Sequence, residues 1–305
     1  MKKVVITGGT KLVGSHLAEL LLDHGYDVHV TGTFNKGREE KYLVGANVHV
    51  CDIRDISAMK EICADTEYVF HLAAIGNVIQ EAIDKPIETE SVNVGGTVTT
   101  LEAARSAGVK KFVFISSAAI YGEQKVVPFT EDMVASPIDP YGLYKYFGEQ
   151  LVRLWSEQYG VPAVSLRVFN AYGSRNPVGA NELVIGRFLD LRLKGQPLTM
   201  VGDGSSTRDY VHVKDIARAA LLAAEHPTIT SGEVFNIGSG VETSLKELVS
   251  LMGGPVVHLE SLEGSHAGPS RRVADISRAK TILNWSPKIS LKEGIEALKQ
   301  ELGIK

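Results

Sequence analysis

The sequence predicts an α/β protein built around a doubly wound parallel sheet. Two features of its first half predict this fold: short β-branched segments alternate with longer amphipathic segments, and a glycine-rich turn joins the first strand to the first helix. Crossovers between parallel strands are right-handed, so helices should cover both faces of the sheet. Ligands of such folds bind beyond the carboxyl ends of the strands, where we expect the functional residues.

Six segments have the β-branched and aromatic composition of buried strands. They are residues 4–7, 27–30, 47–50, 68–71, 111–116 and 163–168. Helical periodicity covers residues 15–25, 55–64, 97–108 and 141–159. This alternation predicts a dinucleotide-binding, Rossmann-type domain over residues 1–170.

Beyond residue 170 the pattern changes, and Gly, Pro and Asn become more frequent. We expect a helix near residues 183–194, strand-like segments at 208–213 and 234–240, and helices that begin near Ser244 and Leu291. Residues 171–305 are therefore predicted to form mainly a smaller, mixed α/β lobe that binds the substrate. We expect the chain to return to the main sheet around residues 205–240.

Composition narrows the class of protein. The 305 residues are 44% hydrophobic and 22% charged with a net charge of -4, which is typical of a globular protein and unlike a nucleic-acid binder with clustered Lys and Arg. No apolar run approaches the ~20 residues of a membrane helix, and strand-like residues begin too early for a signal peptide. We expect a cytoplasmic protein that binds neither nucleic acid nor membrane.

The two cysteines, Cys51 and Cys63, have no Cys or His neighbour at metal-ligand spacing. The nine histidines include no HExxH pair. We expect reduced thiols and no metal site.

The turn in residues 4–17, VVITGGTKLVGSHL, lies between a strand and a helix. Backbone N–H groups and the positive end of the helix dipole can bind the phosphates of a dinucleotide there. Gly8 and Gly14 bound the turn. Lys11 stands between them, where its side chain could add charge near a phosphate or point to solvent.

The end of the second strand bears on the choice of cofactor. A carboxylate usually binds the adenosine ribose at this place, which here falls on Gly32, with Lys36 and Arg38 following. NAD is the expected cofactor. NADP stays open beside it, because no carboxylate at Gly32 repels a 2′-phosphate.

Three of the ten tyrosines have a lysine four residues later, in the pairs Tyr121 and Lys125, Tyr141 and Lys145, and Tyr210 and Lys214. Two side chains at this spacing meet only on a helix. The segment after Tyr210 alternates like a strand, and the one after Tyr121 enters a loop. Only the segment from Tyr141 has sustained helical periodicity, with Pro140 at its start.

A tyrosine that acts as a base needs its pKa lowered from about 10 to near 7, which requires ~4 kcal/mol. An ammonium ~4 Å away at an effective dielectric near 20 supplies about that much, so Lys145 is sufficient for Tyr141 by this arithmetic. Ser117, at the end of the fifth strand, could bind the same substrate oxygen. The alternative for Ser117 is a turn serine at a strand end.

Six blocks carry a family resemblance. They are SSAAIYG, SPIDPYGLYK, RVFNAYG, VGDGSSTRDYVHVKDIARA, FNIGSG and RRVADISRAKTILNWSPKISLKEGI. In this order the chain resembles the nucleotide-sugar epimerase and dehydratase branch of the extended short-chain dehydrogenase/reductases, and is similar to UDP-glucose 4-epimerases. The resemblance covers nearly the whole chain.

The resemblance implies roles for individual residues. The implied catalytic residues are Ser117, Tyr141 and Lys145. The implied cofactor-binding residues are Gly8, Lys11, Leu12, Val13, Gly14, Asp52, Ile53, Leu72, Ala73, Ala74, Tyr141 and Lys145. The implied substrate-binding residues are Ser117, Tyr141, Asn170, Arg208 and Arg271, with Arg272 as the alternative to Arg271.

Some of these positions have other readings or depart from the family. Asp52 could instead cap a helix or turn, and Arg208 could form a salt bridge with Asp209 or Asp215. Lys11 replaces the middle glycine of the family's GxxGxxG turn, and His266 stands where the family often has an arginine.

Two alanines narrow the reaction. Family 4,6-dehydratases carry an Asp-Glu pair after the catalytic Ser or Thr, because removing water needs an acid and a base. Ala118 and Ala119 occupy those places, and the glutamate of the related decarboxylases is also missing. The resemblance therefore implies an NAD-dependent UDP-sugar 4-epimerase that works by transient oxidation to a 4-keto sugar.

Two alternatives remain open: an NAD(P)H-dependent reductase of a nucleotide-linked 4-keto-6-deoxy sugar, and a non-catalytic dinucleotide sensor. Pocket segments at 76–81 and 176–183 should set the sugar, which the sequence does not identify. By resemblance, helices near 88–107 and 141–159 would pair in a homodimer.

Overall fold

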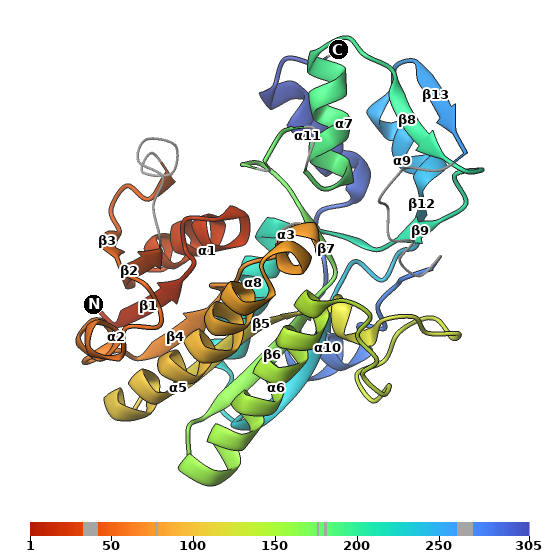
Figure 1. Ribbon diagram of the computed structural model, residues 1–305. Helices are drawn as coiled ribbons and strands as arrows, with labels where there is room; N and C mark the ends of the chain where they lie inside the picture. The colour runs from red at the N-terminus through yellow and green to blue at the C-terminus, as the bar shows by residue number, and fades with distance from the viewer. Residues whose placement is uncertain (33–41, 77–78, 176, 180–181, 261–270, 305) are drawn as a thin grey trace.

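The computed structural model describes residues 1–32, 42–76, 79–175, 177–179, 182–260 and 271–304 (Figure 1). Its centre is a seven-stranded sheet in the order β11-β6-β5-β4-β1-β2-β3, with every pair of neighbours parallel. The strands are β1 (Lys3–Thr7), β2 (Asp27–Gly32), β3 (Asn47–Val50), β4 (Tyr68–His71), β5 (Lys111–Ser117), β6 (Ala163–Val168) and β11 (Ser231–Ile237). The predicted fold class, a doubly wound Rossmann-type sheet, is confirmed.

Helices cover both faces of this sheet, as Figure 1 shows. One face carries α1 (Leu12–Asp23) and α8 (Val213–Glu225), and the other carries α2 (Ile56–Cys63), α5 (Gly96–Ala107) and α6 (Pro140–Tyr159). Successive strand residues point to opposite faces, so Val4 and Ile6 join the core under α1 and α8 while Val5 joins the core under α5 and α6. Both cores consist of side chains removed from water, which is the main stabilising contribution to the fold.

A third apolar core forms the smaller lobe at the upper right of Figure 1. Its elements are α7 (Val184–Leu193), β8 (Leu198–Val201), α9 (Leu245–Met252), β13 (Val256–Leu259) and α11 (Leu291–Glu301). Short strand pairs join the lobe to the main sheet: β7 (Asn170–Tyr172) with β10 (Tyr210–His212), and β9 (Thr207–Arg208) with β12 (Thr243–Ser244). The chain returns to the main sheet through α8 and β11, and α10 (Ser277–Ile282) packs beside β11.

Local sequence explains where several elements begin. Asp139 caps α6 by accepting a hydrogen bond from the Gly142 N–H at 2.8 Å, and Pro140 takes the first helical position, where no N–H is needed. Ser244 and Ser290 form capping boxes with Glu247 and Glu293 at the starts of α9 and α11.

One expectation about element boundaries was wrong, and the helix predicted over residues 97–108 is confirmed as α5. The strand predicted over residues 208–213 is two short strands, and Val213 already belongs to α8 because His212 caps that helix. The helix predicted from residue 97 follows α3 (Ile79–Asp84), α4 (Pro86–Glu90) and a π-helical turn at Ser91–Gly95. A 3₁₀ turn at Ala118–Tyr121 follows β5.

Two features are absent from the described residues. Among those residues, no helix combines the length and the apolar character needed to cross a membrane. No group of three or more His, Cys, Asp or Glu side chains in the same part of the chain could hold a metal ion.

Candidate active site

The predicted site residues converge at the carboxyl edge of the central strands. The turn with Gly8 follows β1, residues 72–74 follow β4, and Ser117 ends β5. These strands are neighbours in the order β5-β4-β1, and the direction in which later strands are added reverses between β4 and β1. The crevice at such a reversal is the usual ligand site of doubly wound folds.

The glycine-rich turn lies against the chain that follows β4. Gly8 has a φ of +69°, and a Cβ there would lie 2.8 Å from the Cα of Ala73. A Cβ on Gly14 would lie 2.5 Å from the Cα of Gly9. Both positions therefore require glycine. Lys11 does not, because its φ of -86° and ψ of 178° suit any residue, and its side chain lies exposed.

Helix α1 begins directly after Lys11. By helix geometry, the first-turn N–H groups of Leu12, Val13 and Gly14 have no acceptor within the helix, and the helix dipole is positive at this end. A turn without bulky side chains, followed by available donors, fits the pyrophosphate of a dinucleotide.

Gly32 and Asp52 lie at the end of the crevice where the adenosine of the cofactor is expected. Gly32 ends β2, and a Cβ there would lie 3.2 Å from the Thr10 methyl group. Asp52 accepts a 2.9 Å hydrogen bond from the backbone N–H of Arg54 and pairs with its guanidinium, which lowers the pKa of the carboxyl group. Ile53 is buried under Gly96. Asp52 therefore makes the turn contact that the sequence left open, and its contact with the cofactor stays a prediction. Lys36, Arg38, Asn176 and His266 lie outside the described residues.

Ser117, Tyr141 and Lys145 meet beside the crevice. The side chains of Ser117 and Tyr141 share a hydrogen bond. The Lys145 Nζ lies 5.9 Å from the centre of the Tyr141 ring and donates a 2.7 Å hydrogen bond to the carbonyl of Ile115. Lys145 comes one helical turn after Tyr141 on α6, the arrangement that the periodicity predicted.

Burial controls the protonation of this group. It raises the pKa of Tyr141 to about 12, with Asp139 adding to the rise and the Ser117 hydrogen bond opposing it. Burial also lowers the pKa of Lys145 to about 8, against the charge of Glu149. The expectation that Lys145 alone lowers the phenol pKa was wrong for the ligand-free protein. The arithmetic behind it omitted the desolvation of the phenolate.

A buried ion pair of Glu149 and Arg167 lies near Lys145 and favours its charged form. Glu149 follows Lys145 by one turn of α6. Arg167 of β6 donates hydrogen bonds of 2.9 and 3.0 Å to the Glu149 carboxylate. Ser116 donates a further 2.5 Å hydrogen bond to Glu149. Arg167 also donates to the hydroxyl of Tyr121 at 3.0 Å. Every partner comes from a different segment of the main sheet and its connections.

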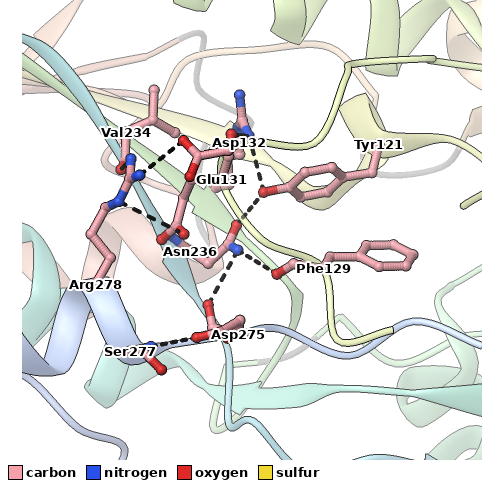
Figure 2. A network of polar contacts seen from close by, with 10 residues as sticks. Tyr121, Phe129, Glu131, Asp132, Val234, Asn236, Asp275, Ser277 and Arg278 are labelled. Atoms are coloured by element: carbon pink, nitrogen blue, oxygen red, sulfur yellow. Dashed lines mark hydrogen bonds and ion pairs between the residues drawn. The ribbon is translucent and has the colours of Figure 1, made fainter. Parts of the chain in front are cut away.

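This network continues toward the C-terminal segment. Figure 2 shows Asn236 at its centre, accepting a 2.6 Å hydrogen bond from the Tyr121 hydroxyl and donating to the carbonyl of Asp275. The backbone N–H of Asn236 donates to Glu131 at 2.8 Å, and Arg278 pairs with that same glutamate. Hydrogen bonds and ion pairs thus connect the residues around Glu149 to the segment that carries Arg271 and Arg272.

The other two tyrosines with a lysine four residues later have structural places. Tyr121 is fully buried in the network of Figure 2, and Lys125 lies exposed in the following loop. Tyr210 belongs to β10, while Lys214 lies exposed on α8. Of the three pairs, the one at Tyr141 shares a helix.

The chain after β4 positions the Tyr141 ring, which the sequence did not predict. Gly76 has a φ of +129°, and a Cβ there would overlap the ring. Asn93, in the π-helical turn, exchanges two 2.8 Å hydrogen bonds with the backbone of Ile75. The signal available in the sequence was an asparagine before paired glycines inside a helical segment.

A cavity of about 190 Å³ lies where the lobe meets the sheet. Its lining includes Asn170 and Arg208, together with Leu183, Val184, Ile185 and Tyr210. Burial lowers the pKa of Arg208. Asp209 accepts hydrogen bonds from Ser239, Gly240 and Ala274, and Asp215 pairs with Arg218.

Arg271 has a different environment from that expected of a nucleotide contact. Its side chain is 58% exposed and pairs with Glu242 through two 2.6 Å contacts. The structure therefore brings Asn170 and Arg208 together and leaves Arg271 on the surface.

Fold and site together define a class: an enzyme that binds a nicotinamide dinucleotide beside a Ser-Tyr-Lys group. The family model described as the NAD dependent epimerase/dehydratase family matches residues 4–238. The chain belongs to this family, and NAD is its cofactor.

Three comparisons place the chain within that family. The UDP-glucose 4-epimerase of Corynebacterium glutamicum is 34% identical over 301 residues, covering 93% of this chain and 91% of the relative. The structure of a UDP-glucose 4-epimerase from Thermotoga maritima with UDP-glucose has 35% identity and a TM-score of 0.88, covering 98% of this chain and 99% of that one. A UDP-glucuronic acid 4-epimerase from Bacillus cereus with UDP-glucuronic acid and NAD has 29% identity and a TM-score of 0.86, covering 99% of each chain.

Gly76→Ala should disable the enzyme without unfolding it. The added methyl group overlaps the Tyr141 ring, and a displaced catalytic group costs on the order of 100-fold in kcat. Gly25→Ala is the matched control, because Gly25 also has a positive φ but has no atom within 4 Å of the added methyl group. It should cost about 1–2 kcal/mol of unfolding free energy and leave kcat unchanged. Full activity of Gly76→Ala would contradict this account.

Glu149→Gln should move the alkaline limb of the pH profile. Glu149 raises the pKa of Lys145, so its neutralisation lowers that pKa below about 8 and Lys145 loses its proton at lower pH. The fall of kcat/KM on the alkaline side should shift down by about one pH unit. Glu157→Gln removes the same charge from the exposed part of α6 and should leave the profile unchanged. An unmoved alkaline limb in folded Glu149→Gln would refute the link.

Proposed function

We propose that the protein is a UDP-sugar 4-epimerase. The observation that carries the proposal is the group of half-buried Ser117 and Tyr141 with buried Lys145 beside the glycine-rich turn, next to Ala118 and Ala119. Two methyl groups stand where a dehydratase would need an acid and a base. The names of the relatives at 34–35% identity, UDP-glucose 4-epimerases, support the same reaction.

The chain's own residues manage the proton of the sugar's C4 hydroxyl. Tyr141 accepts that proton when the sugar is oxidised and returns it when the sugar is reduced, and Ser117 hydrogen-bonds the same oxygen. Lys145 holds positive charge beneath the phenol. NAD, when bound, would supply the hydride acceptor for C4 of the sugar, the hydride donor for the 4-keto form, and a positive charge.

The pKa of Tyr141 limits when its hydroxyl can accept a proton from the sugar. A phenol with a pKa of about 12 keeps its proton at neutral pH, and a positive charge beside it would favour the phenolate that accepts the sugar's proton. The reaction restores its cofactor, so the enzyme should retain NAD through purification. The reductase alternative instead consumes one reduced cofactor per turnover.

The substrate would lie across the two lobes. Asn170 and Arg208 line one cavity on the lobe side, while Tyr141 and Ser117 lie on the sheet side. The planar fork of an arginine binds two phosphate oxygens together, which makes Arg208 the proposed contact for the diphosphate. The sugar itself stays unassigned.

We further propose that α6 pairs with a second copy of the chain. Leu143, Phe147 and Leu154 are 37%, 41% and 44% exposed and share one helical face. An apolar row of this kind on a surface helix is typical of an interface.

Tyr141→Phe tests the catalytic role. It should lower kcat on the order of 10²- to 10⁴-fold while leaving NAD bound, because it removes the hydroxyl and little else. Tyr159→Phe, at the exposed end of α6, should change nothing. The assay follows conversion of UDP-glucose and UDP-N-acetylglucosamine without added cofactor, and mass spectrometry identifies the dinucleotide released on denaturation.

The outcomes of that assay distinguish the epimerase from the reductase and from the non-catalytic sensor. Stoichiometric NADPH consumption would favour the reductase. Bound dinucleotide without any turnover in the unmodified protein would favour the sensor. Unchanged activity of Tyr141→Phe would refute the mechanism itself.

Phe147→Glu tests the interface. A carboxylate buried in an apolar interface is costly, so the variant should elute as a monomer while the unmodified protein elutes as a dimer. Leu193→Glu, which changes an exposed leucine of α7, should stay dimeric. Size-exclusion chromatography with light scattering measures both masses, and a Phe147→Glu dimer would contradict the assignment.

A further inference from the structure

A fully buried histidine ends β4, directly before the chain that packs against the glycine-rich turn. His71 stacks on Phe114 in the core under α5 and α6, with ring centres 5.8 Å apart. Its Nδ1 lies 2.7 Å from the hydroxyl oxygen of Thr7, and its Nε2 lies 3.0 Å from that of Thr97. Both nitrogens of the ring therefore have a partner, and the partners show which nitrogen carries the proton.

The two hydroxyl groups assign the proton of His71. Backbone N–H groups can only donate, so the Thr7 hydroxyl accepts the 3.2 and 3.3 Å hydrogen bonds from residues 72–73 and donates its own hydrogen to Nδ1. A carbonyl can only accept, so the Thr97 hydroxyl donates to Asn93 at 2.6 Å and accepts a hydrogen bond from Nε2. Both contacts require the same form, a neutral ring with its proton on Nε2.

The neutral form of His71 also suits the charge of the site. Burial, together with the charge of Lys145, lowers the pKa of His71 to about 3. Both side chains lie against the Phe114 ring, and the Lys145 Nζ is 5.0 Å from its centre. A second cation in this core would compete with the ammonium that Tyr141 needs, because buried like charges disfavour each other. His71 is therefore uncharged at neutral pH.

The Nδ1 end of His71 reaches the glycine-rich turn. Thr7 and His71 are opposite each other in the register of β1 and β4, and Thr7 directly precedes Gly8. The Thr7 hydroxyl also holds the N–H groups of residues 72–73. Gly8 packs against this chain so closely that a Cβ on it would lie 2.8 Å from the Cα of Ala73. The Nδ1 contact thus helps to fix the spacing between the turn and the chain after β4.

The Nε2 end reaches the ring of Tyr141 through three further residues. The Thr97 hydroxyl donates to the carbonyl of Asn93, whose side chain exchanges two 2.8 Å hydrogen bonds with the backbone of Ile75. Gly76 comes next, and it lies so close to the Tyr141 ring that a Cβ on it would overlap the ring. The Nε2 contact thus helps to fix the chain that packs against the phenol.

We propose that His71 is a positioning residue, which holds the glycine-rich turn through Nδ1 and the chain against the Tyr141 ring through Nε2. The inference rests on the proposed function and adds to it one side chain that sets the place of the cofactor relative to the base. A neutral ring bonded at both ends suits this role, because its hydrogen bonds keep their direction when the charge of the cleft changes.

Two variants each keep one end of this bonding. His71→Asn places an amide oxygen near the Nδ1 position and does not reach Thr97, so kcat should fall about 10- to 100-fold while the rate of NAD release changes less than about twofold. His71→Gln places an amide N–H near the Nε2 position and leaves Thr7 without its acceptor. NAD should then dissociate about 10-fold faster, while kcat of the NAD-loaded enzyme falls less than about threefold. The KM for the UDP-sugar should stay the same in both variants.

Val69→Ala is the matched control. Val69 is buried two residues earlier on β4 in the same core, so its truncation should lower the Tm without altering kcat or NAD release. Kinetics on the purified protein with its bound NAD give kcat and KM, and mass spectrometry of the NAD retained after dilution gives the release rate. If both His71 variants lost kcat and NAD in parallel, in proportion to their Tm, the role would be structural only and the proposal would be overturned.

Nitrogen NMR of the unmodified protein tests the protonation of His71 without a substitution. The ring should carry its proton on Nε2 and should not titrate between about pH 5 and about pH 8, where an ordinary histidine changes its charge. The signal is identified by its loss in His71→Asn. A proton on Nδ1, or a ring that titrates in this range, would refute the assignment. If the unmodified protein retains NAD but converts no UDP-sugar, the proposed function fails, whereas the NAD release rates of the two variants still decide for or against His71.

Discussion

The buried ammonium of Lys145 is the group on which the rest of the site depends. A cation removed from water is unfavourable unless polar partners surround it, and the pKa of about 8 records that cost. The Ile115 carbonyl and Glu149 offset part of it, and Arg167 holds Glu149 in place. These partners come from β5, α6 and β6, so the strand order of the sheet must form before the lysine can lie under Tyr141.

Burial has opposite effects on the pKa values of the two catalytic groups, and both effects disfavour charge. The phenol keeps its proton and the ammonium tends to lose its own. Attraction between opposite charges is stronger at low dielectric than in water, but it offsets the cost of removing both charges from water only in part. A positive charge that enters the cleft would therefore favour the ionised phenol and disfavour the ammonium.

Sequence patterns predicted the parts of the site that depend on local contacts. Tyr141 and Lys145 are one turn apart on a single helix, so periodicity and Pro140 were enough to choose them. The place of Tyr121 could not be predicted in this way, because it joins Arg167 and Asn236 from distant segments. The removal of Tyr141 from water likewise depends on the chain after β4, which packs against its ring at Gly76. No local sequence pattern predicts that long-range contact.

Arg271 and Arg272 are adjacent in the sequence but differ in exposure, and the backbone pairing of their segment determines which one is exposed. Successive side chains of an extended segment point to opposite sides, so only one of two adjacent arginines can pack inward, and here Arg272 has the buried Nε. The bridge between Phe129 and Ala274, with the hydrogen bond from Ala274 to Asp209, decides which one. A slip of one residue would exchange the surface cation and the buried one.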